Sequence, residues 1–556
     1  MYQDKDFTLS NAALFNYITK EKKDVWSIYI YAILSGLVQL SIPLGIQAIV
    51  SFIMGATMVT SLYILIFFIV LGTFLVGLFR VKVMQIIEKI QQKMFVEYSI
   101  AFATKIPKIN LSATKKYYLP ELVNRFFDTQ NLQKGISKIL LEIPTALIQI
   151  VFGILLLSFY HPWFLVFGAL VIIIVAIIFK FTMNSGIRSS LEESEKKYAV
   201  ASWLEDIAGA VKTFKINSTA DAHLTGTDER VVRYLKHRTS HFRVLEFQYK
   251  TIIGFNVIIT MLMLTIGTYL LVTQQLNIGA FIATEIVVLT IMSAVERLIK
   301  SLESYYDVIA SLVKLNKVTE LPEEQNGIIN LQKEHGGMEV KLDDVSFAFT
   351  DNRPILKNIS FEAKPNTITV ISGAFGAGKT TLLSVMAGFY ENTSGAIMFD
   401  KIPLNNLDKN QLRSRIGLYT QDMIIIKGTL LENILLGRKN VSADEVIKLS
   451  EEIGLEELPS LFSKGFDTEI SETDTEVSFS GKKKITLLRA LLGTNRLLML
   501  EDPLQGMNEE FRTRMIRHLE KIKAFTTIII ISQGSALQDI ADQHLHLEDG
   551  HLYTVK

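Results

Sequence analysis

The stretch Gly373-Ala-Phe-Gly-Ala-Gly-Lys-Thr-Thr381 decides the fold of the second half of this chain. It fits the phosphate-binding loop pattern G-x-x-x-x-G-K-[ST]. The β-branched run 367–371 before it predicts a buried strand, and the run 381–387 after it predicts a helix. The alternative is a glycine-rich turn with a chance lysine, but such a turn needs neither the strand nor the helix. The sequence therefore predicts a loop that binds a polyphosphate.

The residue types of this loop suit phosphate and Mg²⁺. Glycines let the backbone wrap the phosphates with its N–H groups pointing inward, at the positive end of the following helix. Lys379 is expected to reach the terminal phosphates, and the Thr380 hydroxyl is expected to bind Mg²⁺. The predicted phosphate-binding residues are Gly373, Gly376, Gly378, Lys379, Thr380 and Thr381.

Composition excludes several classes of function. The chain has 556 residues, a net charge of +1 and no cysteine. Without cysteine there are no disulfides, no thiolate metal site and no cysteine nucleophile. The near-neutral charge gives no reason to expect a nucleic-acid partner. The mean hydropathy of +0.30 comes from long apolar runs in the first half of the chain.

Six segments of that half are long and apolar enough to cross a membrane, which takes about 20 residues. They are 26–53, 61–86, 138–160, 163–183, 250–273 and 278–300, with soft ends. The alternative is a very apolar soluble core. However, the run 165–179 is apolar on all sides, unlike a half-exposed helix of a soluble protein.

The connections between the segments orient them in the membrane. The short connections 54–60, 160–163 and 274–277 carry no lysine or arginine. The two long connections are basic and contain Lys105, Lys108, Lys115, Lys116 and Arg125, and Lys196, Lys197, Lys212, Lys215 and Arg230. By the positive-inside rule the long connections and both termini are cytoplasmic. We expect a multi-pass protein of the inner (plasma) membrane, in contact with membrane lipid.

Two features of this half have open interpretations. The first 26 residues hold Phe15, Ile18 and Trp26 among charges, which predicts either a short interfacial helix or a disordered tail. Glu285 lies within the sixth apolar segment, where a carboxylate is costly. It is expected either to face a transport pathway or to lie in a helix interface.

The order of these features resembles an ATP-binding cassette (ABC) exporter half-transporter, and the resemblance covers nearly the whole chain. It implies an α-helical transmembrane exporter domain with six spans over residues 1–320 and a linker over 321–337. It implies an α/β nucleotide-binding domain built on the phosphate-binding loop (P-loop) over 338–556. The implied cofactors are ATP and Mg²⁺.

The resemblance also implies further site residues. Phe349 stands where the family carries the aromatic residue that stacks on adenine, and Gln421 resembles the glutamine that binds Mg²⁺ and water and senses the membrane domain. Glu472 resembles the acidic residue of the loop that faces the partner's cytoplasmic helices. Two short coupling helices are expected near Tyr117–Leu122 and Tyr198–Leu204. Their aromatic residues either dock on the cassette or make ordinary helix contacts.

Two acids of the implied active site are exchanged relative to the family. The family has an aspartate that binds Mg²⁺ and then a glutamate that acts as general base, whereas here Glu501 precedes Asp502. Glu501 is the implied metal ligand and would crowd the Mg²⁺ shell. Asp502 is the implied base and would fall short by roughly 1 Å, a misplacement that can cost about a hundredfold in rate. Alternatively, Asp502 still works after a backbone adjustment.

Three more positions depart from the family. Gln533 replaces the switch histidine, and its amide can donate to the γ-phosphate but carries no charge. Asn508 stands where the family has aspartate. Residues 477–481 correspond to the signature motif of the family. An ungapped comparison makes Ser478 the phosphate-contacting serine of this motif and puts Phe479 where glycine lets the backbone approach phosphate. Shifting the register to Ser480-Gly481 restores a Ser-Gly pair but shortens the spacing to the helix.

The resemblance implies an ATP-binding exporter subunit that pairs with a second half-transporter, identical or different, and hydrolyses ATP slowly. The implied catalytic residues are Asp502, Gln533 and Gln421, and the implied metal ligands are Thr380, Gln421 and Glu501. The run 42–47 and the cassette loosely resemble peptide and protein exporters of type I secretion, which use a periplasmic adaptor protein. The N-terminal peptidase-like domain of many such exporters is not expected here. Lipid or drug export is an alternative, and so is a non-hydrolytic regulatory subunit.

Overall fold

The computed structural model describes residues 12, 14–55, 60–112, 119–217, 221–332, 335–349, 353–438, 440–472 and 477–555. The chain forms two compact units. One is helical and contains residues 1–107 and 117–321, and the other contains residues 108–116 and 322–556. The predicted order, a six-span helical domain followed by an α/β domain, is confirmed.

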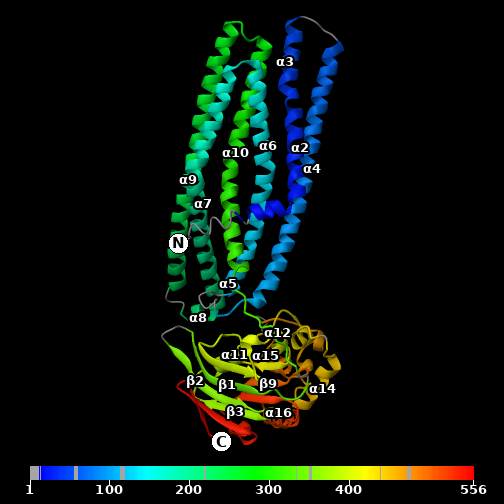
Figure 1. Cartoon of the computed structure of the whole chain (residues 1–556), viewed down its shortest axis with the longest axis vertical. Helices are drawn as coiled ribbons and strands as arrows, with labels where there is room; N and C mark the ends of the chain where they lie inside the picture. Colours follow the sequence, from blue (N-terminus) through cyan, green and yellow to red (C-terminus); the bar gives the residue numbers. More distant parts are fainter. Residues whose placement is uncertain are drawn as a thin grey trace. The chain divides into compact units, whose positions relative to one another are not determined.

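The helical unit consists of very long helices (Figure 1). They are α2 (Lys22–Gln39), α3 (Ser41–Met54), α4 (Thr60–Lys105), α6 (Asp128–Tyr160), α7 (Trp163–Gly209), α9 (Ala222–Val272) and α10 (Ile278–Thr319). Within the described ranges, six helical segments are long and apolar enough to span a membrane, with α2 and α3 counted together. Five of the predicted spans lie inside these segments, and the span 250–273 ends one residue after α9. Helices such as α9, with 51 residues, are much longer than the roughly 20 residues that cross a bilayer.

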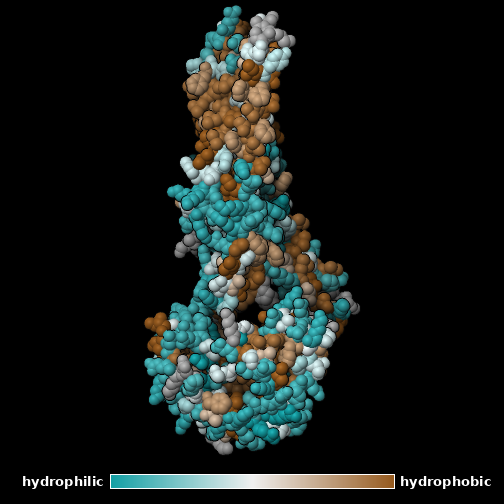
Figure 2. Space-filling view, turned by 90° about the vertical axis from the view of Figure 1, so that its right-hand side faces the viewer, coloured by the Kyte–Doolittle hydropathy of each residue, from teal (hydrophilic) through white to brown (hydrophobic). Residues whose placement is uncertain are grey.

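The surface of this unit agrees with a membrane location. In Figure 2 its apolar residues gather in a band, with hydrophilic residues beyond the band. Glu285 is exposed on α10, on the same side as the exposed Leu289 one turn later. Glu285 is therefore not buried between helices of this chain, and both interpretations, a carboxylate facing a transport pathway and a carboxyl in a helix interface, stay predictions.

One of the two expected coupling helices is misplaced. Residues 198–204 lie inside α7, which continues to Gly209, and the short helix that follows is α8 (Val211–Ile216). Trp203 explains the difference, because its indole packs on Gly226 of α9 and its Nε1–H donates to Thr227 at 3.1 Å. The aromatic residue thus makes an ordinary helix contact.

The other expected coupling helix is only partly described. Tyr117 and Tyr118 lie outside the described residues, as do Lys115 and Lys116. The described part of this connection contains the short helix α5 (Leu119–Asn124).

The chain start is helical where it is described. Residues 14–20 form a helix, so the disordered tail is the wrong alternative for them. Leu14 is buried, and Glu21 pairs with Lys93 of α4 at 2.6 Å. Phe15 and Trp26 remain exposed.

The second unit contains two main sheets. Its strands are β1 (Val340–Ala348), β2 (Pro354–Ala363), β3 (Ile368–Gly373), β4 (Ser394–Phe399), β5 (Ile402–Pro403), β6 (Ile416–Tyr419), β9 (Leu497–Glu501), β10 (Thr527–Ile531), β11 (Gln543–Glu548) and β12 (His551–Thr554). The antiparallel sheet has the order β2-β1-β4-β5, and the larger sheet has the order β12-β11-β3-β10-β9-β6. A further small pair joins β7 (Gly428–Thr429) and β8 (Glu469–Ile470).

Helices and the antiparallel sheet pack against the larger sheet, which therefore has two buried faces. The helices of this unit are α11 (Lys379–Met386), α12 (Lys409–Ser414), α13 (Leu430–Leu435), α14 (Ala443–Ile453), α15 (Phe479–Leu491), α16 (Glu509–Ile522) and α17 (Ser535–Asp539). β10 is fully buried, as expected for a parallel strand covered on both faces. Because β3, β9 and β10 are parallel, the residues that follow them meet at one edge of the sheet.

The second unit also holds a piece of the first long connection. Backbone N–H groups of Asn110 and Glu324 donate to the carbonyls of Pro322 and Lys108 at 3.0 and 2.8 Å. Arg413 binds both carboxylate oxygens of Glu324 at 2.5 and 2.7 Å. These bonds tie the start of the interdomain connection to the α/β unit.

Candidate functional site

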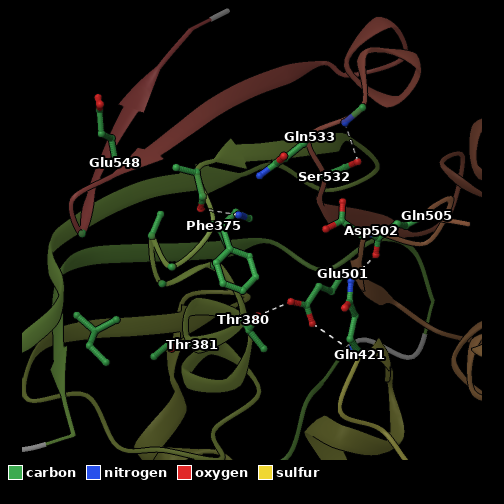
Figure 3. A pocket seen from close by; sticks show the side chains of 18 of the residues that line it. Phe375, Thr380, Thr381, Gln421, Glu501, Asp502, Gln505, Ser532, Gln533 and Glu548 are labelled. Carbon is green, nitrogen blue, oxygen red and sulfur yellow. Dashed lines mark hydrogen bonds between the residues drawn. The ribbon is translucent and has the colours of Figure 1, made fainter.

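An open pocket of about 1380 Å³ lies at the edge where β3, β9 and β10 end. Its floor is the phosphate loop, residues 374–381, and its walls come from the residues after β9 and β10 and from Glu548 at the end of β11. Figure 3 shows Thr380, Glu501, Asp502 and Gln533 directed into one space. The loop, the two acids and the glutamine predicted from sequence are therefore brought together.

The loop has the backbone that only glycine adopts readily. Gly376 and Gly378 have φ angles of 81° and 99°, in the region that costs other residues strain. At Gly373 an added Cβ would lie 2.3 Å from the carbonyl oxygen of Leu547 in β11, so a side chain there would push the two strands apart. Backbone conformation thus favours glycine at 376 and 378, and the close approach of β11 favours it at 373.

Lys379 is folded onto its own loop. Its Nζ donates to the carbonyls of Gly373 and Ala374 at 2.7 and 2.9 Å. These carbonyls hold the ammonium group at the mouth of the loop, where a bound phosphate would meet it. Gln533 reaches the same Gly373 carbonyl with its Nε2 at 2.9 Å.

Glu501 joins the loop to the glutamine segment. Its carboxylate, only 8% exposed, accepts hydrogen bonds from the Thr380 hydroxyl and from the Gln421 backbone N–H, the second at 3.1 Å (Figure 3). The side-chain amide of Gln421 donates from Nε2 to Oε1 of Gln505 at 2.9 Å. The longer side chain of glutamate allows this direct reach across the space between the two elements.

Asp502 has an unusual backbone. Its φ of 43° places a non-glycine residue in the left-handed region, which aspartate tolerates better than most residues. Its N–H donates to the carbonyl of Ile531 at 2.7 Å. The carboxylate is half-buried and lines the pocket. The backbone turn that follows Glu501 therefore aims Asp502 away from the sheet and into the pocket.

The two acids affect a neighbouring phenol. Tyr419 is 1% exposed at the end of β6. Burial, together with the charges of Glu501 and Asp502, raises the pKa of Tyr419 to about 12. Tyr419 therefore stays neutral and adds no charge to the acidic end of the site.

The donor set suits Mg²⁺. Thr380, Glu501 and Gln421 offer a hydroxyl, a carboxylate and an amide oxygen from elements that are already hydrogen-bonded to one another. Oxygen donors with few carboxylates and room for phosphate and water are what Mg²⁺ takes. The residues present fit this metal ion.

Phe349 forms part of an aromatic cluster at another wall of the pocket. Its ring meets Phe347 and Tyr390 edge-on, at centroid distances of 4.9 and 5.3 Å. It is 38% exposed and lines the pocket. Part of the ring is therefore accessible from the pocket.

The signature residues do not line this pocket. Ser478 caps α15, with its Oγ accepting from the Gly481 N–H at 3.0 Å, and Phe479 is 70% exposed. Asn508 caps α16 by accepting from Phe511 at 2.9 Å. Glu472 binds Lys482 at 2.9 Å and the Ile425 N–H at 3.0 Å. Within this chain these residues lie outside the pocket, and the expected contacts of Ser478 with phosphate and of Glu472 with a partner's cytoplasmic helices stay predictions.

Some pocket residues were missed from sequence. Phe375 is fully exposed in the loop itself and projects into the pocket in Figure 3. It occupies a variable place of the loop pattern, so the pattern gave no reason to select it. Gln505 was missed because its contact with Gln421 joins residues 84 positions apart, which no local pattern predicts.

Comparisons with known proteins support both halves. A family model described as ABC transporter transmembrane region matches residues 25–295. A second, described as ABC transporter, matches residues 356–505. The matched ranges take up most of the chain and agree with the helical unit and the pocket-bearing unit.

Individual relatives are distant. A multidrug resistance ABC transporter ATP-binding and permease protein of Lactococcus lactis is 27% identical over 302 residues, which are 52% of this chain and 49% of that protein. The lactococcin-A transport/processing ATP-binding protein of Lactococcus lactis is 24% identical over 549 residues, 96% of this chain and 74% of that protein. The chain spans about half the length of the first curated relatives that it matches.

A solved structure shares the fold of nearly the whole chain. It is a bacterial Atm1-family ABC exporter with ATP bound, with a TM-score of 0.85, 17% identity, and coverage of 96% of this chain and 95% of that one. The helical unit and the α/β unit thus have the fold of that exporter. The six helices that can span a membrane and the two matched family models make the chain a multi-pass membrane protein with a cytoplasmic ATP-binding domain. The chain therefore belongs to the ABC transporter family, with the family's transmembrane region and its ATP-binding domain on one polypeptide.

Proposed function

We propose that this chain is an exporter half-transporter that binds MgATP in the pocket of its α/β unit and hydrolyses it slowly. The observation that carries the proposal is the Thr380–Glu501–Gln421 hydrogen-bonded set beside the phosphate loop. It joins the loop to two other elements at the place where a nucleotide's terminal phosphates would lie. For export, ATP binding would change the conformation of the helical unit, and hydrolysis would return it to its starting conformation.

The proposed roles follow from the contacts. When ATP binds, the Lys379 ammonium group leaves the two loop carbonyls and contacts the β- and γ-phosphates. The loop glycines donate backbone N–H groups to the phosphates. Thr380, Gln421 and Glu501 hold Mg²⁺, which would neutralise charge on the phosphates. The ring of Phe349 stacks on the adenine. Thr381 lies in the first turn of α11, whose N-terminus attracts anions.

Slow hydrolysis follows from how the pocket holds its acids. Glu501 already binds both neighbours of the metal position directly. Glu501 would have to share its carboxylate between these two donors and Mg²⁺. Asp502 and Gln533 are then left to orient and deprotonate the attacking water. The carboxylate of Asp502 is short, and the amide of Gln533 carries no charge to stabilise the γ-phosphate.

The rival proposal is a subunit that binds ATP without turning it over. It is favoured by the position of Phe479, which would stand between backbone and phosphate if Ser478 contacts the nucleotide of a partner chain. In a dimer of identical chains both sites would be impaired. With a different half-transporter, each of the two sites would combine one impaired and one intact half.

The substrate proposal rests on a curated match that covers nearly the whole chain. Near-complete coverage by the lactococcin-A transport/processing protein supports peptide export, with a periplasmic adaptor as a further partner. The multidrug relative supports drug export as the alternative, and lipid export is a third candidate. We propose the peptide class first because that match includes the helical unit as well as the ATP-binding domain.

An ATPase assay on the purified chain separates the two proposals. The chain is reconstituted alone in lipid, and phosphate release is compared with that of Lys379→Ala. Slow release above the variant's level supports the enzyme. If release equals the variant's level while MgATP still binds, the non-hydrolytic subunit is the better account. Loss of MgATP binding in the unaltered chain would refute both.

A further inference from the structure

Three polar side chains meet beneath the phosphate loop and have no role in the function proposed above. Ser372 is the last residue before Gly373, and its Oγ lies 2.9 Å from Nδ1 of His546 and 3.0 Å from Nε2 of His544. The same oxygen lies 3.2 Å from the carbonyl oxygen of Leu545. Ser372 is 7% exposed and the two histidines are half-buried. We call Ser372, His544 and His546 the polar triad.

The triad interrupts an apolar face of the sheet. His544 and His546 pair with Val370 and Ser372 in the parallel β11–β3 register, so their side chains share one face. On the same face, Val370 packs with Ile528 and Ile530 in a buried apolar cluster. Buried polar groups without partners are costly. Ser372 is the buried member, so its hydroxyl depends on the two histidines and on the Leu545 carbonyl for its hydrogen bonds.

The geometry assigns the protons of the triad. A hydroxyl has one proton and can accept two hydrogen bonds. The Leu545 carbonyl can only accept, so the Ser372 proton goes to it and both imidazoles donate to the Ser372 oxygen. Each imidazole then carries a proton on the nitrogen that faces Ser372, which is Nε2 of His544 and Nδ1 of His546. This arrangement satisfies all three contacts.

The triad is linked to the pocket on two sides. Ser372 is bonded to Gly373, whose carbonyl receives both Lys379 and Gln533. His546 is followed by Leu547, whose carbonyl lies against Gly373, and then by Glu548, which lines the pocket. A shift of β11 along β3 would therefore move the start of the phosphate loop and one wall of the pocket.

We propose that Ser372, His544 and His546 are positioning residues for nucleotide binding: their hydrogen bonds lock β11 to β3 and so fix the phosphate loop at the point where Lys379 and Gln533 meet. The inference rests on the proposed binding of MgATP to this pocket. It makes the triad act through the loop backbone, without contact with the nucleotide. Its loss weakens ATP binding although every loop residue is still present.

The test uses variants that remove or retain one donor at a time. Ser372→Ala removes the shared oxygen, and His544→Leu and His546→Leu each remove one N–H. The matched controls are Ser372→Thr, His544→Gln and His546→Asn, because a glutamine amide places an N–H near the Nε2 position and an asparagine amide near the Nδ1 position. MgATP dissociation constants are measured on the full chain in lipid, together with nucleotide-free thermal midpoints.

We expect Ser372→Ala to raise the dissociation constant about threefold to tenfold, the effect of losing one or two hydrogen bonds of ordinary strength. The threonine, glutamine and asparagine variants should remain within about twofold of the unaltered chain, while the leucine variants resemble Ser372→Ala. If the triad only stabilises the fold, the variants should lower the thermal midpoint, but the dissociation constants of donor-retaining and donor-removing variants should not differ.

Nitrogen-15 spectra of histidine-labelled chain provide a second readout. The unaltered chain should show a protonated Nε2 on His544 and a protonated Nδ1 on His546, and both signals should change in Ser372→Ala. Unchanged affinity in Ser372→Ala, or equal losses in donor-retaining and donor-removing variants, would overturn the triad's role. If the unaltered chain binds no MgATP, the proposed function fails as well, so the two failures are distinguishable.

Discussion

At the scale of single residues, the site is a set of charges and donors placed by backbone geometry. Lys379 is the main positive group of the phosphate loop, and among the described residues it donates to two loop carbonyls. A bound phosphate would give the ammonium a charged partner in place of two neutral ones. Charge-assisted hydrogen bonds are worth about 1.5–3 kcal/mol each.

We therefore expect Lys379→Ala to abolish measurable MgATP binding, as followed by equilibrium binding of a fluorescent ATP analogue. Lys364→Ala is the matched control, since Lys364 is an exposed lysine of the same unit, in the turn before β3. It should bind as the unaltered chain does. Wild-type affinity in Lys379→Ala would show that this loop does not hold the nucleotide.

Sequence patterns predicted the identity of these residues better than their contacts. The loop pattern selected Lys379 and Thr380, and the exchanged acids were visible as Glu501 followed by Asp502. The direct bonds of Glu501 to both Thr380 and Gln421 were not predictable, because they depend on where β6, β9 and α11 lie in three dimensions. Phe375 escaped notice because the pattern accepts any residue at its position.

At the scale of elements, periodicity and length predicted the spanning helices, because a run that is apolar on all sides has few other folds. The expected helix at 198–204 was wrong because one aromatic residue, Trp203, packs against α9 rather than ending α7. Aromatic composition alone does not distinguish a docking surface from a helix contact.

The orientation of the elements can be tested by labelling, since the chain has no cysteine. Gln275, in the connection between α9 and α10, and Lys215, on α8, are both exposed. The positive-inside rule puts Gln275 outside and Lys215 in the cytoplasm. A cysteine at 275 should react with a membrane-impermeant maleimide on intact cells. A cysteine at 215 should react only after permeabilisation, and the opposite pattern would contradict the topology.

The packing of α14 on α16 predicts a pH dependence of stability. Burial lowers the pKa of His518 on α16, while Glu452 of α14, 3.1 Å from its Nδ1, acts in the opposite direction. The folded chain thus binds this proton less tightly than the unfolded chain does. Its contribution to stability is complete above the unfolded pKa of about 6.5 and is lost as pH falls through the lowered folded value.

We expect the thermal midpoint of the nucleotide-free chain to fall between about pH 7 and pH 5, and His518→Gln to remove part of that slope. Lys521 and His518 lower the pKa of Glu452. The contribution of Glu452 to stability is therefore lost only below its unfolded pKa of about 4.3, outside this pH window. An identical slope in His518→Gln would show that other groups set the dependence.

At the scale of the whole molecule, the chain joins a membrane-spanning helical unit to an ATP-binding unit. The sequence predicted this organisation from two independent signals, apolar length in one half and the phosphate loop in the other. It did not predict that residues 108–112 join the α/β unit, because their bonds to residues 322–324 connect segments more than two hundred positions apart. It also leaves the cargo open, since cargo contacts depend on side chains of several helices together.

The central claim is that this chain is an ATP-driven transporter whose hydrolysis is slowed by the arrangement of its own acids. The most direct test is the ATPase rate of the reconstituted chain beside the triple variant Glu501→Asp, Asp502→Glu, Gln533→His. The variant shortens the metal ligand, lengthens the base and restores an ionisable group near the γ-phosphate. Phe479→Gly is added in a second variant, in case the aromatic ring blocks closure.

Placement of a general base is commonly worth about 10²–10⁴ in rate. We therefore expect one of the two variants to hydrolyse ATP at least about tenfold faster than the unaltered chain, with MgATP binding unchanged and with Lys379→Ala inactive in both backgrounds. If neither variant gains activity while both bind MgATP, the slow-enzyme account is contradicted, and the chain is better described as a nucleotide-binding subunit without turnover.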